Sequence, residues 1–459
     1  MRAFLKKMVG KAPESVVELA KVVYDLTPPR MRYGKPYVDA VNLLAAGERW
    51  SVEELASYRD TRLVKLIEHC YDHVPYYRDA FDASGIVPSD IKGMADIANL
   101  PFLTKRIVRE RKQDLVADNF PYLQQDREHT SGSTGAPLDF LLDRETRAME
   151  MALALRVLLW LGYTQGDRVA EFKEDRFADP RRISRYFPGS RHLKFSFFTV
   201  DDDKLDRMVG ELERFRPVFI KAFPSSILVL ARWMERNGRA IPPPKYIVTS
   251  SENLYPSIRE HAERVFQAPV IDYYGQNERV ATAFQCQLAG GYHVQMEEAA
   301  VELIPSRGDQ CEIVGTSLTA FGMPFIRYRT GDLAIPASEP CPCGRSHPLI
   351  SRIVGRGCDV IVTPERNIVA PVAMDYAFYH LEEIREAQIV QESIDTLRVK
   401  IVPWESLSDM TRGTLLREID SYLQSPTMKV IWDEVGEIPR TAGGKRPFVV
   451  SRINVDEYI

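Results

Sequence analysis

The middle of the chain alternates between short apolar runs and longer stretches with helical spacing. Four apolar runs have the length of buried strands: 193–200, 217–223, 245–250 and 269–275. A segment with helical periodicity follows each of the first three. Strands and helices that alternate in this way predict right-handed crossovers and a mostly parallel sheet. Ligands bind beyond the carboxyl ends of such strands, and this rule selects three loops: 223–226, 249–253 and 273–278.

The flanking segments follow other patterns. Residues 52–71 and 143–162 predict helices, and the second of these has Asp143 as a plausible N-cap and Gly162 as a plausible stop. From about Ala299 onward the apolar runs are shorter and indicate antiparallel strands.

A domain boundary is predicted at "VGRGCD" (354–359), where two glycines flank an arginine. Three strand-like runs and two helical stretches follow it, over about 100 residues, which is a common domain size. The sequence therefore predicts an α/β protein. Its large N-terminal domain, 1–354, would hold mostly parallel sheets and a β-rich subdomain, and a small mobile α+β lid domain would occupy 355–459.

Composition excludes several classes of protein. The chain has 459 residues, 45% hydrophobic and 27% charged, and its net charge of −4 argues against nucleic acid as a partner. Its six cysteines lack the regular spacing of a secreted disulfide scaffold. No run approaches the roughly 20 apolar residues of a membrane-spanning helix. Residues 1–26 predict an amphipathic helix rather than a signal peptide, which leaves a membrane-surface role open. The expected compartment is a reducing cytoplasm.

Small and hydroxyl-bearing residues make up "HTSGSTGAP" (129–137). Gly132 and Gly135 can adopt positive φ and let the backbone approach a ligand closely, and successive N–H groups in such a turn bind anions. The loop suits a polyphosphate, although the lysine of a Walker A loop is absent. In isolation it could equally be a surface turn.

Three further stretches carry chemistry that suits a nucleotide. Glu278, in "YYGQNE", follows a predicted parallel strand and could bind Mg²⁺, while Tyr274 could stack on a base. Asp332, in "RYRTGDL", follows Gly331 in a tight turn and could accept both hydroxyls of a ribose. Lys445 lies in the glycine-rich "IPRTAGGKRP", where its charge could stabilise a phosphoryl transition state. Each stretch alone could be an ordinary surface loop, but together they are far more specific.

With these motifs in this order, the sequence resembles the adenylate-forming superfamily of acyl-CoA synthetases and amino-acid adenylation domains. Within it the sequence resembles the phenylacetate–CoA ligase-like family, including the branch named for capsular polysaccharide biosynthesis. The motifs are "TSGSTGAP", "TSSEN", "YYGQNE", "YRTGD", "VGRGCD" and "RTAGGKRP", and the resemblance covers about Leu63 to Arg452. It implies an AMP-forming acid ligase: a carboxylate attacks the α-phosphate of ATP to give an acyl-AMP and pyrophosphate, and a second nucleophile then displaces AMP.

The resemblance also implies roles for individual residues. Lys445 would contact the α-phosphate and carboxylate oxygens during adenylation, and Glu278 would bind Mg²⁺. The ATP and AMP site would comprise Thr130, Ser131, Gly132, Ser133, Thr134, Gly135, Ser251, Glu252, Tyr274, Gly275, Asp332 and Arg356. Cys358 and Asp359 would belong to the hinge about which the C-terminal domain swings between the two steps. The acyl pocket would lie between segment 195–225 and the strand ends in "TSSENL" and "DYYGQ".

Departures from the family pattern concern the second step. Cys358 replaces the first aspartate of the usual hinge motif, and Glu365 and Arg366 stand where a glycine that contacts CoA is expected. CoA is the preferred acceptor, as in a ligase for an aryl or related acid. One alternative is direct acyl transfer to an amine or hydroxyl in polysaccharide or natural-product biosynthesis. Another is a non-catalytic nucleotide-binding scaffold, which would tolerate loss of Lys445 and Glu278, yet both are present. A homodimer is left open.

A second kind of site, for a structural metal, is suggested by four residues: Cys286, His293, Cys341 and Cys343. Three thiolates and one imidazole can complete a tetrahedral zinc site. The spacing of Cys341 and Cys343 is tighter than usual, but some members of the resembled family carry a Cys/His cluster at matching positions. The alternative is four separate residues, the cysteines packing as small hydrophobes. A zinc hydrolase is disfavoured because four protein ligands leave no open coordination position.

Overall fold

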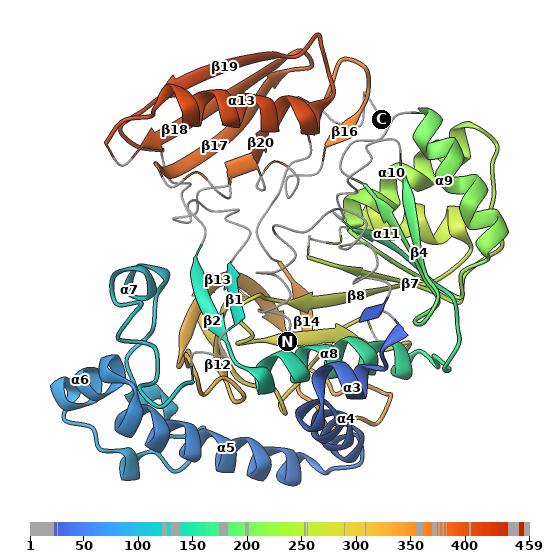
Figure 1. Ribbon diagram of the computed structural model, residues 1–459. Coiled ribbons are helices and arrows are strands. Elements are labelled where there is room, and N and C mark those ends of the chain that lie inside the picture. Colours follow the sequence, from blue (N-terminus) through green and yellow to red (C-terminus); the bar gives the residue numbers. More distant parts are fainter. Residues whose placement is uncertain are drawn as a thin grey trace.

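The computed structural model describes most of the chain (Figure 1): residues 23–24, 26–121, 126–129, 138–173, 182–197, 202–251, 254, 256–288, 290–307, 309–354, 361–369, 374, 377–378, 381, 383–403, 405–438 and 449–453. Several predicted site residues lie outside these ranges: Thr130, Ser131, Gly132, Ser133, Thr134, Gly135, Glu252, Arg356, Cys358, Asp359 and Lys445. Most of the N-terminal segment 1–26 also lies outside them.

Helices form most of the described residues before the sheet: α3 (Pro29–Tyr33), α4 (Lys35–Gly47), α5 (Val52–His73), α6 (Pro75–Ser84), α7 (Lys105–Glu110), α8 (Arg144–Trp160) and two short 3₁₀ turns, Pro88–Asp90 and Ile97–Asn99. Local signals explain where the two longest begin. Ser51 and Glu54 form a capping box at the start of α5, and the Asp143 carboxylate accepts the Thr146 N–H at 2.8 Å at the start of α8. Gly162, with φ of 77°, follows the end of α8, which confirms the predicted stop.

A 12-stranded mixed sheet forms the centre of the large domain, in the order β11-β12-β13-β14-β10-β9-β8-β7-β6-β3-β5-β4. The strands are β3 (Val169–Lys173), β4 (Ser184–Phe187), β5 (His192–Ser196), β6 (Phe219–Ala222), β7 (Tyr246–Ser250), β8 (Val270–Gly275), β9 (Thr282–Gln285), β10 (Tyr292–Val294), β11 (Ala299–Arg307), β12 (Gln310–Ser317), β13 (Tyr328–Pro336) and β14 (Leu349–Ile353). The five strands β5, β3, β6, β7 and β8 run parallel, as the alternating pattern predicts.

The β-rich part predicted after Ala299 continues this sheet rather than forming a separate one. The chain turns back after β8, so that β9 pairs antiparallel with it and Gly275 faces Thr282. Strands β10 to β14 then extend the antiparallel half. One continuous surface therefore connects the parallel strand ends to the β13 strand that carries Asp332.

Side-chain alternation along the parallel strands accounts for the helical layers on both faces. On β6 and β7, Ile220 and Ile247 join one buried cluster, whereas their neighbours Phe219 and Val248 join another. The first cluster packs against α9 (Asp202–Phe215), α10 (Pro224–Arg236) and α11 (Pro256–Phe266), and the second against α4 and α8 (Figure 1). Helix α9 contributes its apolar stripe: Leu205, Met208, Val209 and Leu212.

The C-terminal part forms a separate α+β unit, orange to red in Figure 1. Its four-stranded sheet has the order β19-β18-β17-β20, with strands β17 (Ile384–Ser393), β18 (Thr396–Pro403), β19 (Lys429–Glu434) and β20 (Val449–Ser451). Helix α13 (Asp409–Leu423) packs on it through Leu415, Ile419 and Leu423. A short hairpin, β15 (Ile361–Val362) and β16 (Ile368–Val369), precedes this sheet.

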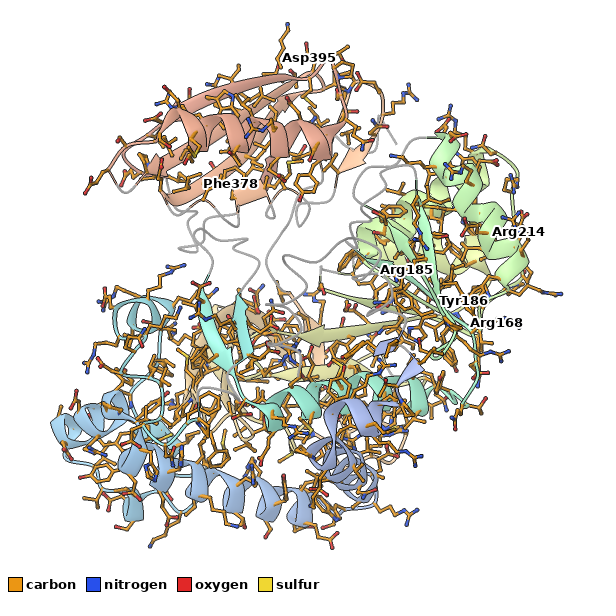
Figure 2. All side chains as sticks on the ribbon, in the orientation of Figure 1. Arg168, Arg185, Tyr186, Arg214, Phe378 and Asp395 are labelled. Carbon is orange, nitrogen blue, oxygen red and sulfur yellow. The ribbon has the colours of Figure 1, made fainter. Side chains whose placement is uncertain are left out.

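The two parts touch through polar side chains, as Lys204 Nζ of α9 donates to Gln424 Oε1 beside α13 at 3.0 Å. Figure 2 marks Phe378 on the side of the C-terminal unit that faces the large domain, and Asp395 on its outer side. On the edge strand β4, Arg185 is 6% exposed and Tyr186 is 46% exposed, so that only one face of this edge is covered (Figure 2). Among the described residues no helix is both long and apolar enough to cross a membrane.

Candidate nucleotide and metal sites

The carboxyl ends of β7 and β8 lie side by side and carry two of the predicted site loops. Ser250 pairs with Tyr273 at the ends of these parallel strands. Ser251, directly after β7, has φ of 74°, a left-handed conformation that is uncommon for a residue with a side chain and often marks functional loops. The structure therefore brings Ser251 to the same sheet edge as Tyr274 and Gly275.

Tyr274 and Asp332, 58 residues apart, meet at this edge. The Tyr274 hydroxyl donates to Asp332 Oδ2 at 3.0 Å. The amide Nε2 of Gln276 lies 3.1 Å from the same carboxylate oxygen and 2.5 Å from the tyrosine hydroxyl. The aromatic ring predicted to stack on a base and the carboxylate predicted to bind a ribose thus belong to one hydrogen-bonded group.

A bulge in β13 presents Asp332. Arg329 pairs with Val314 and Leu333 with Glu312, so three residues of β13 lie opposite one residue of β12. Gly331 occupies the bulge with φ of 75°, and the Asp332 N–H donates to Thr330 Oγ1 at 2.9 Å. The carboxylate, 9% exposed, is consequently held on a rigid backbone.

Glu278 is fixed to the same strand. It is 9% exposed, and its Oε1 accepts a hydrogen bond from the Tyr328 hydroxyl at 2.9 Å. Tyr328 is the first residue of β13 and is fully buried. Glu278 and Asp332 are therefore both positioned by β13, although Glu278 itself follows β8.

A buried carboxyl further back on β8 locks the neighbouring strands. Asp272 Oδ1 accepts from Thr249 of β7 at 2.6 Å, and its Oδ2 accepts from the Tyr292 hydroxyl of β10 at 2.7 Å. Burial raises the pKa of Asp272, and these two hydrogen bonds oppose that rise. Asp272 and Tyr274 are two positions apart on β8, so their side chains lie on the same face of the strand. The hydrogen bonds of Asp272 therefore stabilise the strand end that carries Tyr274.

The predicted phosphate loop is flanked by a hairpin that sequence patterning did not reveal. Strands β1 (Asp126–His129) and β2 (Asp139–Leu142) pair antiparallel on either side of residues 130–137, which lie outside the described ranges. Arg147 of α8 pairs with Asp126 at 3.2 Å and also with Glu128. At the base of the hairpin, the Asp143 carboxylate accepts the Phe321 N–H at 2.8 Å. These contacts anchor the hairpin to the large domain.

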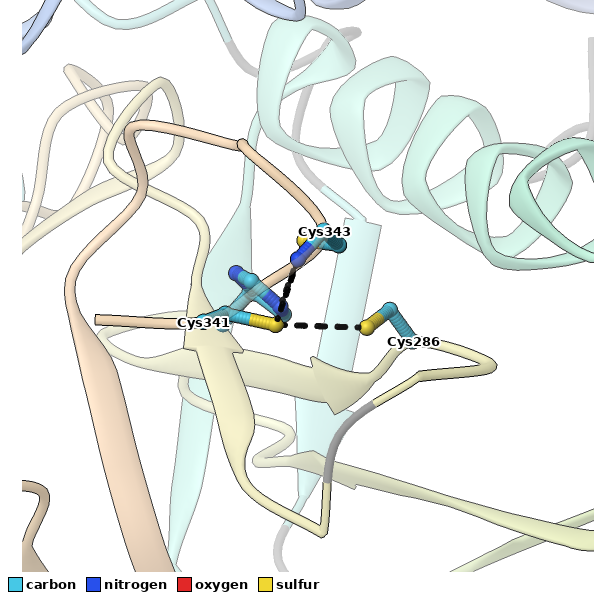
Figure 3. A group of neighbouring side chains, drawn as sticks. Cys286, Cys341 and Cys343 are labelled. Atoms are coloured by element: carbon cyan, nitrogen blue, oxygen red, sulfur yellow. Dashed lines mark hydrogen bonds between the residues drawn. The ribbon is translucent and has the colours of Figure 1, made fainter. Parts of the chain in front are cut away.

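The four predicted zinc ligands come together from three segments of the antiparallel half. Figure 3 shows the three cysteines among them. Their donor atoms all lie within 4.8 Å of one another. The Sγ atoms of Cys286 and Cys341 are 3.6 Å apart, and Cys343 Sγ lies 3.5 Å from His293 Nε2. Zinc–sulfur bonds of about 2.3 Å in a tetrahedron place sulfurs about 3.8 Å apart, so the donor set fits zinc.

The surroundings of the cluster suit a closed site. Cys286 and His293 are 1% and 0% exposed, and the Trp160 indole packs edge-on against the His293 ring. Burial lowers the pKa of His293 to about 4, so that its imidazole is neutral at pH 7. Beside it, Glu297 accepts from Arg156 at 2.9 Å and from His347 at 3.0 Å in a second buried group.

The cluster and the nucleotide residues lie at opposite edges of the sheet. Strand β9 begins beside Gly275, at the carboxyl end of β8, and runs antiparallel to its end at Gln285. Cys286 follows that far end directly. The metal-type cluster is thus separated from Tyr274 and Asp332 by the length of β9, which favours a structural role.

Glu298 is a buried carboxyl outside both groups. It is 0% exposed, and neither carboxyl oxygen has a hydrogen-bond partner of acceptable geometry in the part of the chain that the structure describes. Burial raises the pKa of Glu298 from 4.5 to about 7. Between these two pH values the folded protein keeps a proton on Glu298 that the unfolded chain has released. Folding stability is therefore expected to fall as the pH rises from about 4.5 to about 7 and to level off above that.

Replacement of this carboxyl should remove the pH dependence. Glu298→Gln is expected to match the wild type near pH 5 and to be more stable by about 1–3 kcal/mol at pH 8. Urea denaturation at both pH values measures this difference, with Glu260→Gln, an exposed glutamate of α11, as the control. An equal loss of stability between pH 5 and pH 8 in wild type and variant would contradict the assignment.

Sequence reasoning missed two residues of the nucleotide group, Gln276 and Tyr328. Both lie inside or beside quoted motifs, but nothing in the letters distinguishes them from their neighbours. Gln276 contacts Asp332, 56 residues away, and Tyr328 contacts Glu278, 50 residues away.

Comparison with known proteins identifies the fold. A solved structure of 2-hydroxyisobutyryl-CoA ligase, in complex with 2-HIB-AMP and CoA in its thioesterification state, is similar with a TM-score of 0.60 and 22% identity. The similarity covers 88% of this chain and 91% of that one. A second structure of that ligase, in the postadenylation state, is similar with a TM-score of 0.57. The chain therefore has the same fold as this CoA ligase.

Sequence comparison finds relatives that match most of the chain. The phenylacetate-coenzyme A ligase of Thermus thermophilus is 25% identical over 86% of this chain and 95% of that protein. The protein CapK of Staphylococcus aureus is 22% identical over 92% and 94% of the two chains. Residues 361–452 match the family described as the CapK C-terminal domain. The chain is therefore similar over most of its length both to phenylacetate-coenzyme A ligases and to CapK.

Proposed function

We propose that the protein is an ATP-dependent carboxylate-activating ligase that forms an acyl-AMP and pyrophosphate and then transfers the acyl group to an acceptor, in the first instance CoA. One observation carries this proposal. Tyr274 and Asp332 share hydrogen bonds at the carboxyl ends of the parallel strands, in a chain similar to phenylacetate-coenzyme A ligases over most of its length. A non-catalytic nucleotide-binding scaffold would also use Tyr274 and Asp332, but it would tolerate the loss of Glu278 and Lys445, and both are present.

Each residue of the group has a role in binding ATP. The Tyr274 ring would pack on adenine, and Asp332 would accept the ribose hydroxyls. Ser251, together with Gly275, Glu252 and Arg356, would line the rest of the nucleotide. The loop residues Thr130, Ser131, Gly132, Ser133, Thr134 and Gly135 would bind phosphates at the tip of the β1–β2 hairpin. The chemistry at phosphorus then requires positioning and charge more than covalent participation by protein groups.

Glu278 suits a magnesium ligand because its carboxylate is held in one orientation by Tyr328 at 2.9 Å and forms no other hydrogen bond or ion pair with the described residues. Magnesium in such sites is bound by one or two carboxylates together with the substrate phosphates. The ion would neutralise phosphate charge, while Glu278 would fix its place relative to Asp332.

The identity of the acyl acceptor is a separate question. The names of the relatives favour CoA. Phenylacetate-coenzyme A ligases are similar over most of this chain, and the matched ligase structure contains CoA. Arg366 supplies the argument for the alternative of an amine or hydroxyl. It has φ of 65° at the exposed tip of the β15–β16 hairpin, a conformation that favours the glycine expected there. Glu365 beside it is also exposed and accepts a hydrogen bond from the Thr427 hydroxyl at 2.5 Å, so two charged side chains occupy the tip where a glycine is expected.

Four further parts of the proposal concern the whole chain. The large domain would span 1–354 and the lid 355–459, swinging at Cys358 and Asp359 between the two half-reactions. Zinc, held by the four-residue cluster, would stabilise the antiparallel half without taking part in catalysis. The protein would act in the cytoplasm, with polysaccharide or natural-product biosynthesis as the setting if the acceptor is not CoA. Whether it acts as a homodimer can be decided by light scattering.

Pyrophosphate exchange tests the proposal directly. Purified protein should incorporate labelled pyrophosphate into ATP only when a suitable carboxylic acid is present, because exchange requires a reversibly formed acyl-AMP. A panel of aryl, hydroxy and short aliphatic acids should contain at least one acid that raises the exchange rate about tenfold or more over the acid-free rate. A rise of this size would mark that acid as a substrate of the adenylation step. A screen with CoA, amines and amino sugars then identifies the acceptor.

Two outcomes of this assay would count against the proposal. Exchange that does not depend on any acid of a broad panel would contradict carboxylate activation. ATP binding without exchange, in protein that retains Lys445 and Glu278, would instead support the scaffold alternative. Asp332→Asn serves as the negative control, since it keeps the shape of the site but removes the charge that would bind the ribose.

A further inference from the structure

Gln276 lies in the loop after β8, between Tyr274 and Glu278, and its backbone is fixed by a turn. The Arg279 N–H donates to the Gln276 carbonyl at 3.2 Å, and Arg279 itself has φ of 56°. The side chain therefore leaves the sheet edge from a defined position rather than from an open loop.

The carboxamide of Gln276 closes a three-membered hydrogen-bonded group. Its Nε2 lies 2.5 Å from Tyr274 Oη and 3.1 Å from Asp332 Oδ2, and Tyr274 Oη lies 3.0 Å from the same Oδ2. The donors fit one arrangement, in which the tyrosine proton and one amide proton point to Asp332 and the other amide proton points to the tyrosine oxygen. Reversing the amide would place its carbonyl oxygen against a carboxylate, so the orientation is determined by chemistry.

Two consequences follow for a ligand that uses Asp332. Hydrogen bonds to a charged acceptor are stronger than neutral ones, so Oδ2 is held by two donors before any nucleotide arrives. A carboxylate oriented in advance loses less freedom when it accepts ribose hydroxyls, which strengthens binding. The same contacts fix the Tyr274 hydroxyl and with it the plane of the ring.

This arrangement also has a cost in stability. Gln276 Oε1 is buried and has no hydrogen-bond partner among the described residues. A buried acceptor left without a partner destabilises a folded protein, and such groups concentrate where function requires a particular side chain. An apolar residue of similar size would avoid this penalty but would supply neither amide proton.

We propose that Gln276 is a positioning residue for nucleotide binding: its amide aligns the Asp332 carboxylate and the Tyr274 hydroxyl, so that the ribose is recognised by a preformed group. Gln276 acts through these two side chains and need not touch the reacting atoms. The inference rests on the proposed nucleotide site, and it adds a residue whose part in that site is defined by its contacts alone.

The test compares Gln276→Leu with the wild type in AMP binding and in acid-dependent exchange. Loss of both amide donors is expected to weaken AMP binding and to raise KM for ATP about tenfold, with kcat and KM for the acid changed less than about twofold. Discrimination between ATP and 2′- or 3′-deoxyATP should fall as well, because a less oriented Asp332 gains less from each hydroxyl. Gln267→Leu, the same change just before the start of β8, is the matched control.

A second variant supplies a signature that a purely structural role would not produce. Gln276→Glu places a carboxyl beside Asp332: ionised, it repels Asp332, and protonated, it donates to it as the amide does. KM for ATP in Gln276→Glu should therefore fall several-fold as the pH is lowered through the pKa of the new carboxyl. Gln276→Leu, which has no group that titrates there, should show no such fall over the same pH range.

The outcomes separate this inference from the proposed function. If wild type catalyses exchange and Gln276→Leu leaves KM for ATP and deoxy discrimination unchanged, the positioning role is wrong and the ligase assignment stands. Equal changes in kcat and in both KM values, with a lower Tm and no pH response in Gln276→Glu, would also overturn it. If wild type binds AMP but catalyses no exchange, titration calorimetry with AMP still decides the role of Gln276. Failure of the wild type to bind AMP would overturn both.

Discussion

Lys445→Ala is expected to lower acid-dependent pyrophosphate exchange about 10²–10³-fold while leaving transfer from a supplied acyl-AMP within about threefold of wild type. The reason is the place where charge develops. During adenylation the α-phosphate gains negative charge as the carboxylate attacks and pyrophosphate departs, and the proposed lid would bring Lys445 to stabilise that charge. In the second step the acceptor displaces AMP from the acyl group of an acyl-AMP that is already formed. The motif gives Lys445 no role in this transfer step.

The adjacent cation provides the control for this prediction. Arg446→Ala removes a positive charge from the same glycine-rich stretch of sequence, which lies outside the described residues, and should retain most of the exchange activity. Equal loss of both half-reactions in Lys445→Ala would contradict the assigned role, since it would indicate damage to the lid as a whole. Equal effects of Lys445→Ala and Arg446→Ala would indicate a general contribution of charge.

Much of the parallel half could be predicted because its signals are local. Strands β5 to β8 lie in short, mostly apolar runs, and α9 shows its stripe in residues three and four apart. Strand β3 was missed although it lies in the centre of the sheet, between β5 and β6. Its Glu171 adds a charge to a short run, and Lys194 at 3.4 Å and Lys221 at 3.6 Å on the neighbouring strands pair with that charge.

The candidate site shows the same division between local and long-range information. Tyr274, Glu278 and Asp332 could be predicted from short motifs, because binding a nucleotide requires particular residue types at fixed positions within those motifs. The contacts among them could not, since Gln276 and Asp332 are brought together by the bulge in β13 and by pairings across five antiparallel strands. The β1–β2 hairpin was missed for a related reason: its polar residues Asp126 and Glu128 are satisfied by Arg147 of α8.

Zinc content and thermal stability should change together when a cluster cysteine is replaced. Cys341→Ser is expected to lose the zinc that wild type carries at one ion per chain and to lower Tm by roughly 5–10 °C, the shift expected from removing a few kcal/mol of stability. The change in stability arises because Cys286, His293 and the pair Cys341 and Cys343 come from separate segments, which one ion would tie together.

Position in the fold determines what this variant should leave intact. Since the cluster lies beyond the far end of β9 from Gly275, KM for ATP in the fraction that remains folded should stay within about twofold of wild type. Cys311→Ser, on β12 outside the cluster, controls for the substitution itself and should alter neither zinc nor Tm by a comparable amount. Metal analysis with differential scanning calorimetry decides the question. Equal zinc content in wild type and Cys341→Ser would mean that the four residues only pack together and do not bind zinc. Loss of exchange activity when zinc is removed from folded protein would instead indicate a catalytic role for zinc, which the geometry does not favour.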